Sequence, residues 1–460
     1  MLKKIIIAMS MASLLAAGCA KEPELPEPVT IKVLAWNANV FNAKYGSFYI
    51  ATHPDDDLEV ISVVERLEQN GGGDPDAVVD ELIEKENPDV IALPHNFFER
   101  ARDKSALQPL DDLAKKARFD LAGISPSVID ALSAEGKLFG LAATFTGHAL
   151  YYNKALFDRY KIAYPTDYMT WDEVFALATR FAKAPAGDEP AEFGLDYASS
   201  VNPFMMALNI GETDGISVYA NGKFTLNTEA WEHIFQNVKS CLASGACLDR
   251  AKTNKPAVSS LKESQLNDMP FLNGRVAMAV NDSRLFRTLG GGGYESIEWG
   301  MATVPVSERE PDTGAAAVPD DVLTIPKNAP QPAAAWRLLQ YIGGEDYAKV
   351  LPRIDPSSLS ARNLGDDQSD DDKAVFYKLR HRNPSFAASL SALSVTVLNR
   401  IEEISRMYTP QAMSGGSVGR RCPEAHGVRN AVGVGSRKRE FGERFTQDAR
   451  PRIKLGEMKL

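Results

Sequence analysis

The chain has 460 residues, 44% of them hydrophobic and 24% charged, with a formal net charge of −10. This length and apolar content are enough for two folded domains, whereas four cysteines are too few for a disulfide scaffold. From Ser414 onward 11 Lys/Arg stand against 5 Asp/Glu, a net of +6, so the remainder carries −16. An acidic body of this kind argues against nucleic acid as the natural partner.

The first residues have the pattern of a secretory signal. Lys3 and Lys4 precede an apolar run, Ile5 to Leu15, which is too short to span a bilayer and predicts a signal peptide over residues 1–18. The small residues before Cys19 resemble the lipobox of bacterial lipoproteins, so Cys19 is expected to be lipidated; a free cysteine beside an ordinary cleavage site is the alternative. Residues 19–28 are charged and Pro-rich and predict an extended tether. The mature chain would then be secreted and lipid-anchored to the outside of the cell membrane.

The body that follows alternates strands and helices. Apolar runs predict strands at Val29–Trp36, Leu58–Val64 and Asp89–Leu93. Asp74-Pro75 predicts the start of a helix that ends near Asn87, because Asp is a good cap and Pro suits the first helical position. Strand, helix and strand at this spacing predict parallel pairing with right-handed crossovers.

The segment from Gly136 to Glu173 is the most informative part of the chain. Its short apolar runs predict buried strands at Leu138–Ala143 and His148–Tyr152, followed by a helix over Asn153–Tyr160. Thr170 and Glu173 have the spacing of a capping box, which predicts that a further amphipathic helix begins there.

The later part of the chain predicts further elements of both kinds. Strands are expected at Phe271–Val280, Trp299–Val304 and Asp321–Pro326, and helices at Ala333–Ile342, closed by Gly343, and around Val397 to Tyr408.

Two cysteines lie close together at the end of another predicted helix. Cys241 and Cys247 are separated by LASGA, and in an oxidising compartment a local disulfide between them is plausible; two buried thiols are the alternative. A zinc site is not expected, because no second Cys/His pair has ligand spacing, and no other metal site is predicted.

The order of motifs in the central segment also resembles a known family. GKLFGLAA, then LYYNKALFDRY, then YP and MTWDEV resemble the central segment of bacterial extracellular solute-binding proteins of family 1, the maltodextrin-binding-like substrate-binding components of ABC importers. The resemblance runs from about Val29 to Thr409. It implies an α/β, two-lobed periplasmic-binding-protein-like fold with a ligand cleft between the lobes and chain crossings near Ala142–His148 and Ala317–Asp321.

The resemblance also implies a division of the chain into lobes. Residues 29–143 and 270–318 are expected to form lobe 1, and residues 144–269 and 319–413 lobe 2. Residues 414–460 form an atypical basic tail without a sustained helical or strand period. Either a frameshift has replaced an authentic final helix, or the tail is a genuine disordered segment; an intact reading frame confirmed by the protein's mass would exclude the frameshift.

A sugar presents hydroxyls around an apolar ring face, so its site needs polar side chains beside an aromatic platform. Such sites lie at the carboxyl ends of strands in open α/β sheets. The candidates are those that follow predicted strands, lie in the crossings, or occupy a region that approaches ligand in the family: Trp36, Asn37, His95, Asn96, Phe97, Thr146, Asn202, Phe204, Asn281, Asp282 and Asp320. Core packing or turn capping is the alternative role for each.

No catalytic constellation emerges, and the one G-x-S-x-G pattern, at 415–419, has no strand before it. We therefore expect no enzyme and no cofactor. The expected function is capture of an extracellular solute, a sugar or oligosaccharide, by a monomer that delivers it to ABC permease subunits. The alternatives are an extracellular carbohydrate-active enzyme with two facing carboxylates, and a surface sensor or adhesin that works without a permease.

Overall fold

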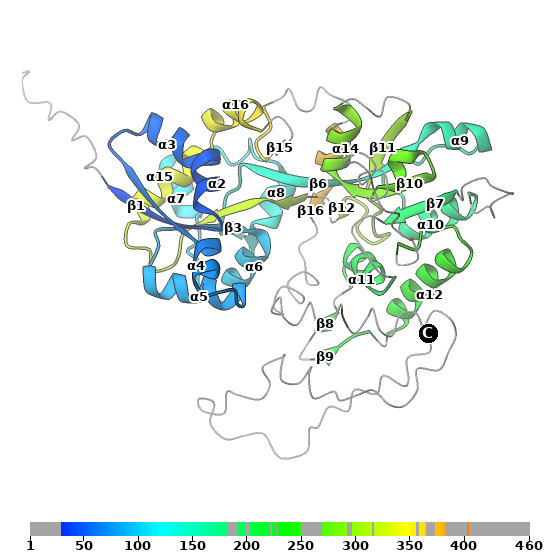
Figure 1. Cartoon of the computed structure of the whole chain (residues 1–460), viewed down its shortest axis with the longest axis horizontal. Helices are drawn as coiled ribbons and strands as arrows, with labels where there is room; N and C mark the ends of the chain where they lie inside the picture. The colour runs from blue at the N-terminus through cyan, green and yellow to red at the C-terminus, as the bar shows by residue number, and fades with distance from the viewer. Residues whose placement is uncertain are drawn as a thin grey trace, which may run out of the picture.

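The computed structural model describes residues 29–181, 192–197, 203–216, 218–220, 223–226, 228–250, 269–291, 297–314, 317–355, 358–364, 373–381 and 403. Two β-sheets, each packed with helices, form two lobes joined by chain crossings (Figure 1). The predicted signal peptide, tether, final helix (apart from residue 403, which lies within it) and basic tail lie outside these residues. No helix of the described ranges is long and apolar enough to cross a membrane.

The sheet of the first lobe has the strand order β14-β3-β1-β2. Its strands are β1 (Thr30–Ala35), β2 (Asp57–Ser62), β3 (Val90–Pro94) and β14 (Asp321–Thr324). The first three are parallel, as predicted, and β14 is antiparallel to β3. The second strand ends two residues before its predicted end, because the Ser62 hydroxyl accepts from the Glu65 amide and caps the next helix.

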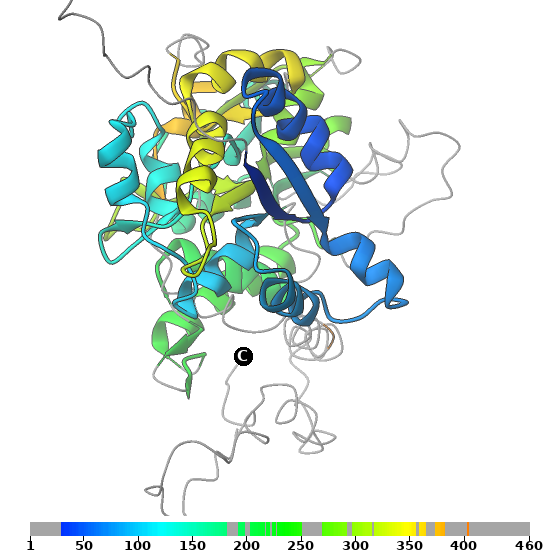
Figure 2. The same cartoon turned by 90° about the vertical axis from the view of Figure 1, so that its left-hand side faces the viewer.

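Helices cover both faces of this sheet, and Figure 2 looks onto this lobe. In chain order, the helices of this lobe are α2 (Ala38–Phe41), the π-helix η1 (Asn42–Gly46), α3 (Ser47–Thr52), α4 (Val63–Gln69), α5 (Pro75–Glu86), α6 (His95–Asp103), α7 (Asp111–Ala117), α8 (Pro126–Ala131), α15 (Pro332–Ile342) and α16 (Glu345–Ile354). Asp74 caps α5 as predicted, and Asn87 ends it in the left-handed conformation at φ 46°. Gly343 closes α15, also as predicted.

The sheet of the second lobe has the strand order β11-β6-β10-β7. Its strands are β6 (Thr144–Asn153), β7 (Phe193–Tyr197), β10 (Val276–Asp282) and β11 (Trp299–Thr303). Its helices are α9 (Lys154–Tyr160), α10 (Trp171–Thr179), α11 (Pro203–Thr213), α12 (Glu229–Ala243) and α14 (Ser283–Gly290). The predicted capping box is present: Glu173 accepts from the Thr170 amide at 2.7 Å, and Thr170 from the Glu173 amide at 3.3 Å.

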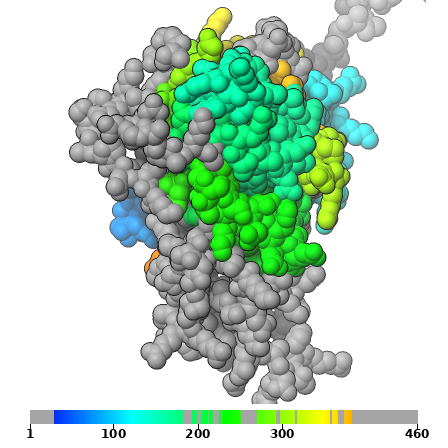
Figure 3. Space-filling model, turned by 90° about the vertical axis from the view of Figure 1, so that its right-hand side faces the viewer, coloured from blue at the N-terminus to red at the C-terminus, as the bar shows by residue number. Residues whose placement is uncertain are grey.

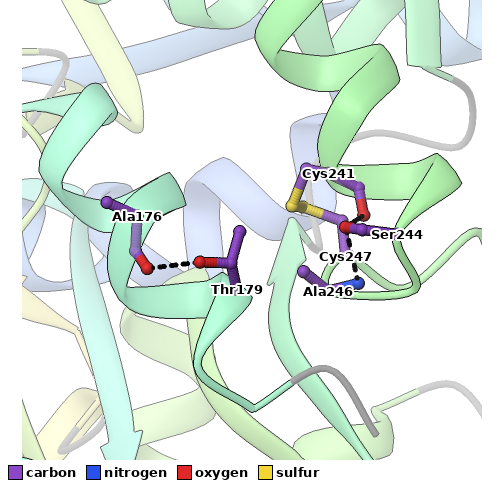
Figure 4. The surroundings of a disulfide bond; sticks show 6 residues. All are labelled: Ala176, Thr179, Cys241, Ser244, Ala246 and Cys247. Atoms are coloured by element: carbon purple, nitrogen blue, oxygen red, sulfur yellow. Dashed lines mark hydrogen bonds between the residues drawn. A yellow bond between two sulfur atoms is a disulfide. The ribbon is translucent and has the colours of Figure 1, made fainter. Parts of the chain in front are cut away.

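Helices α10 and α12 of this lobe pack against each other, and Figure 3 faces this end of the molecule, with α12 in bright green. Cys241, near the end of α12, is bonded to Cys247, with 5.1 Å between their Cα atoms. The Ser244 hydroxyl within the closed loop donates to the Cys241 carbonyl at 3.0 Å (Figure 4). The disulfide therefore fastens the end of α12 to the segment that pairs with β7, where Cys247 bridges Leu195.

The strand pairing corrects the predicted division into lobes. Residues 270–318 were assigned to lobe 1, but β10 and β11 pair with β6 in the second sheet. Residues 319–413 were assigned to lobe 2, but β14 pairs with β3 in the first sheet, and α15 packs on α3. An apolar run predicts a strand but not the strand with which it pairs. The error therefore lay in the order of the chain crossings and not in the predicted strands and helices.

The crossings contain further short elements. Strand β6 begins at Thr144, four residues before the predicted strand, because β13 (Ala317–Pro319) and β15 (Leu359–Ser360) pair with its first half. The strand predicted over Leu138–Ala143 is confirmed only in part. Strand β5 (Lys137–Leu138) forms a hairpin with β4 (Ser133–Ala134), and Leu141 makes an isolated antiparallel bridge with Leu323 of β14.

A third crossing was not predicted. The 3-10 helix η3 (Lys373–Tyr377) packs on β6, and β16 (Arg380–His381) pairs with β12 (Thr313–Gly314). The remaining short elements are β8 (Tyr219–Ala220), β9 (Lys223–Phe224) and η2 (Pro270–Asn273). Because η2 occupies the first residues of the strand predicted from Phe271, that strand begins only at Val276.

Candidate ligand-binding site

The carboxyl ends of the first sheet's parallel strands lie at the edge from which the chain crosses to the second lobe. Strands β1 and β3 end at Ala35 and Pro94, and β14 begins at Asp321, directly opposite Pro94. Loops that follow β1 and β3 and the residues that precede β14 therefore share one edge. In open α/β sheets this is the edge at which ligands bind.

The second sheet presents the equivalent edge to the same crossings. Strand β10 is parallel to β7, and both β10 and β11 are antiparallel to β6, so β7, β10 and β11 point the same way. They end at Tyr197, Asp282 and Thr303, beside the first half of β6. The Asp320 amide donates to the Thr144 carbonyl at 3.1 Å and ties the two crossing strands together. The carboxyl edges of both sheets thus meet at the crossings.

The two faces of β6 differ at this junction. Successive side chains of a strand point to opposite faces, and Phe145, Gly147 and Ala149 are all buried. On the other face Thr146 and His148 are only half-buried, and Val318, opposite Thr146 on β13, is exposed. Thr144 and Leu150 on this second face are buried, so its accessible part lies between them, at Thr146 and His148.

Polar groups gather on the accessible face. The Thr146 hydroxyl donates to Asp320 Oδ1 at 2.7 Å. Asp282 is directly opposite His148 in the register of β10 and β6, so the two share this face. Arg284, in the first turn of α14, donates from Nε to both carboxylate oxygens of Asp282 at 3.0 Å. We call Thr146, His148, Asp282, Arg284 and Asp320 the polar face.

The charges of the polar face are set by their surroundings. Burial raises the pKa of Asp282, but the hydrogen bonds and charge of Arg284 outweigh it and hold that pKa below its usual range. Burial lowers the pKa of His148 and keeps its imidazole neutral near pH 7. Its Nδ1 is buried and has no hydrogen-bond partner in the part of the chain that the structure describes. Such an atom is expected to find a partner in water or ligand.

A second charged group lies beside the polar face. Lys44 Nζ and the Tyr45 hydroxyl, both from the π-helix η1, donate to Asp321 Oδ2 at 2.9 Å. Lys44 Nζ also lies 3.4 Å from Thr144 Oγ1. Burial and the charge of Asp321 raise the pKa of Tyr45. Lys44 of the first lobe therefore contacts both crossing strands, β6 at Thr144 and β14 at Asp321.

The candidate residues of the first lobe have mixed roles. Trp36 packs on Phe97 with 5.3 Å between ring centroids, and Phe97 is buried. Asn37 caps α2 by accepting from the Val40 amide at 3.0 Å. His95 is largely buried against His381, with 6.4 Å between ring centroids, while Asn96 is exposed. Asn96 is the one exposed residue among these candidates.

The remaining candidates lie on different surfaces. Asn281 points to the face of β10 opposite to Asp282, is buried, and accepts from the Asp282 amide at 2.8 Å. Phe204 of α11 stacks on Phe235 with 5.6 Å between centroids. Asn202 lies outside the described residues. The structure therefore brings Thr146, Asp282 and Asp320 together and separates Asn281 from them.

Sequence reasoning missed Arg284, Lys44 and Tyr45. The position of Arg284 two residues after an N-capping Asp was a usable signal, because the cap places it in the first turn of the helix at the strand end. Lys44 and Tyr45 carried no signal, since a π-turn that points both side chains at Asp321 cannot be recognised from composition. No group of three or more potential metal ligands occurs in the described ranges.

Comparison with known proteins agrees with this geometry. Residues 59–375, more than half of the chain, match the family model described as bacterial extracellular solute-binding protein. A Brucella abortus protein named as a binding protein is 26% identical over 252 residues, which cover 52% of this chain and 54% of that protein. The chain spans about half the length of the curated relatives it matches.

Several solved structures share the fold at low sequence identity. An ABC substrate-binding protein of Listeria monocytogenes in complex with cycloalternan is 16% identical, with a TM-score of 0.56 over 85% of this chain and 95% of that chain. A sugar transporter of Rhizobium etli in an open conformation is 17% identical, with a TM-score of 0.58 over 85% and 95%. The sugar-binding protein of Xanthomonas citri is 17% identical, with a TM-score of 0.59 over 84% and 92%. Together, the two-lobed α/β fold and the match over residues 59–375 show that the chain belongs to the bacterial extracellular solute-binding proteins.

Proposed function

We propose that this protein is the solute-binding component of an ABC importer and that it takes a sugar or oligosaccharide between its lobes. The observation that carries the proposal is the meeting of two carboxyl edges at the crossings, where half-buried hydroxyl, imidazole and carboxylate groups face the accessible side of β6. Polar groups of this kind suit the hydroxyls of a sugar. The names of the structural neighbours, which include sugar-binding proteins, support the same class of ligand.

Thermal-shift measurement against a panel of sugars tests the proposal. Binding to the folded state stabilises it by RT ln(1 + [L]/Kd), so a sugar at 100 times its Kd adds roughly 2.7 kcal/mol and raises the melting temperature. Amino acids and short peptides serve as the comparison panel. A protein that responds to a peptide and to no sugar would contradict the proposed ligand class.

We also propose that binding leads to delivery and not to reaction. The family and its neighbours are binding proteins, so a bound oligosaccharide should be recovered intact after prolonged incubation. Cleavage products on chromatography would point to an enzyme instead. Delivery requires a permease, and uptake of the stabilising sugar should be lost on deletion of this gene and restored by it.

Lipid anchoring at Cys19 belongs to the same proposal, because a tethered receptor stays near its permease. Replacement of Cys19 by alanine should release the protein from membranes into the medium or periplasm. Membrane association that is retained in Cys19→Ala would contradict lipid anchoring at Cys19.

A further inference from the structure

The carboxylates on and beside the polar face differ in how they are paired. Asp282 is paired with Arg284, and the neighbouring Asp321 is paired with Lys44. Asp320 has no ion-pair partner among the described residues and accepts one hydrogen bond, from Thr146. The face therefore offers one carboxylate that can still accept hydrogen bonds.

Arg284 supplies the matching donor. Asp282 binds its guanidinium through Nε and Nη2, while the Arg284 side chain remains 70% exposed and that of Asp282 only 11%. A guanidinium has five N–H donors in a fixed fork. One edge is thus held in place, which leaves the Nη1 group of this largely exposed side chain as a pre-oriented donor.

The positions of these two groups fit a single ring. Asp320 is fixed beside Thr146, and the Asp282–Arg284 pair is fixed beside His148, two residues further along β6. Two residues of a strand span about 7 Å, a length comparable with one sugar ring. The charge of Asp320 also acts on Arg284 and contributes to raising its pKa, after the larger contribution of Asp282. His148, whose Nδ1 lacks a partner in the described part of the chain, is directly opposite Asp282 in the strand register.

We propose that the polar face binds a neutral polyhydroxyl ring, with Asp320 accepting from one hydroxyl and Arg284 donating to another, and that it rejects acidic sugars. Asp320 repels a uronate carboxylate, and Arg284, whose charge is neutralised by Asp282, does not offset this repulsion. This inference rests on the proposed function and names the ligand class within it.

Calorimetric titration of the whole protein tests it, with maltotetraose, cellotetraose, xylotetraose and raffinose as neutral probes and trigalacturonate as the acidic one. Arg284→Met and Asp320→Asn should each weaken binding of the best neutral sugar at least tenfold, the scale of a lost hydrogen bond to a charged group. Arg284→Lys keeps the charge without the fork and should give an intermediate loss. Arg287→Met, an exposed position on the same helix, should bind within twofold of wild type.

The outcomes separate this inference from the function on which it rests. If no sugar in the panel binds, the proposed function fails. If a neutral sugar binds and Arg284→Met behaves like Arg287→Met, the sugar is held elsewhere and the inference alone is overturned. A wild-type preference for trigalacturonate overturns it as well. Melting temperatures of the variants show whether each is folded at the titration temperature.

Discussion

The two faces of β6 show how one strand serves both the fold and the site. On one face Phe145, Gly147 and Ala149 are buried against the helices and loops of both lobes. On the other, Thr146 and His148 are half-buried beside three charged residues. Adjacent residues therefore contribute to different properties, and substitutions one position apart should change different measurements.

The two faces also differ in how closely they follow the rules of core packing. Buried apolar positions follow the rules of a well-packed core, whereas an imidazole nitrogen without a partner and an arginine held on a buried carboxylate do not. Exceptions of this kind concentrate at functional sites. The apolar face should therefore respond in stability, and the polar face in ligand binding.

The largest expected effect on stability is at Phe145. Its side chain is 1% exposed and meets the ring of Tyr377 edge-on, with 5.3 Å between centroids. Phe145→Ala should lower the free energy of unfolding by about 3–5 kcal/mol, because a large buried ring leaves a cavity. Urea denaturation measures it, and a loss below about 1 kcal/mol would show that this face is loosely packed.

The buried histidines should make stability depend on pH. Burial lowers the pKa of both His95 and His381 from 6.5 to about 4, and each is close to Arg102 as well. The unfolded chain therefore binds more protons than the folded one between these values, so stability is complete above about pH 6.5 and falls as the pH is lowered toward 4.

Removal of His381 tests this dependence. His381→Gln should reduce the loss of stability between pH 7 and pH 4 by about 3 kcal/mol, the equivalent of the shift in pKa. Denaturation curves at several pH values give the slope. His233→Gln is the control, because His233 is exposed. Equal slopes in the His381→Gln and wild-type proteins would contradict the assignment.

A smaller effect is expected at Gly147. An added Cβ would lie 2.6 Å from Cδ1 of Phe376 and 2.7 Å from Cδ1 of Leu359, so both side chains must shift. Gly147→Ala should destabilise by about 1–3 kcal/mol. Gly290→Ala, where nothing lies within 4 Å of the new Cβ, is the matched control and should be neutral or slightly stabilising. Destabilisation of both variants to the same degree would remove the steric explanation.

Local features of this fold followed from sequence, and non-local ones did not. The Asp74 cap, the capping box at Thr170 and the strands of the first sheet depend on neighbouring residues and were predicted correctly. The partner of β10 depends on which crossing comes first, and no local pattern records that order. The lobe assignment of residues 270–318 was wrong for this reason.

For the candidate site, the sequence predicted the edge of the sheets at which it lies but not all of its residues. Strand ends identified Asp282 and Asp320, but which residue of the Asn281–Asp282 pair faces the crossings depends on register, which the sequence does not give. In the sequence, Arg284 cannot be distinguished from an ordinary surface residue of a helix, and only the structure shows that its guanidinium binds Asp282. Trp36 and Phe97, predicted as an aromatic platform, pack on each other, and Phe97 belongs to the core.

The affinities of Thr146→Val and Gly147→Ala for the same neutral sugar test the central claim most directly. The two residues are adjacent, point to opposite faces of β6, and only Thr146 bonds to Asp320. Measured by calorimetry where both variants are folded, Thr146→Val should weaken binding about tenfold, since it removes a hydrogen bond to a charged group. Gly147→Ala should bind within about threefold of wild type while melting at a lower temperature. The reverse pattern, with full affinity in Thr146→Val and lost affinity in Gly147→Ala, would place the ligand on the other face and contradict the account.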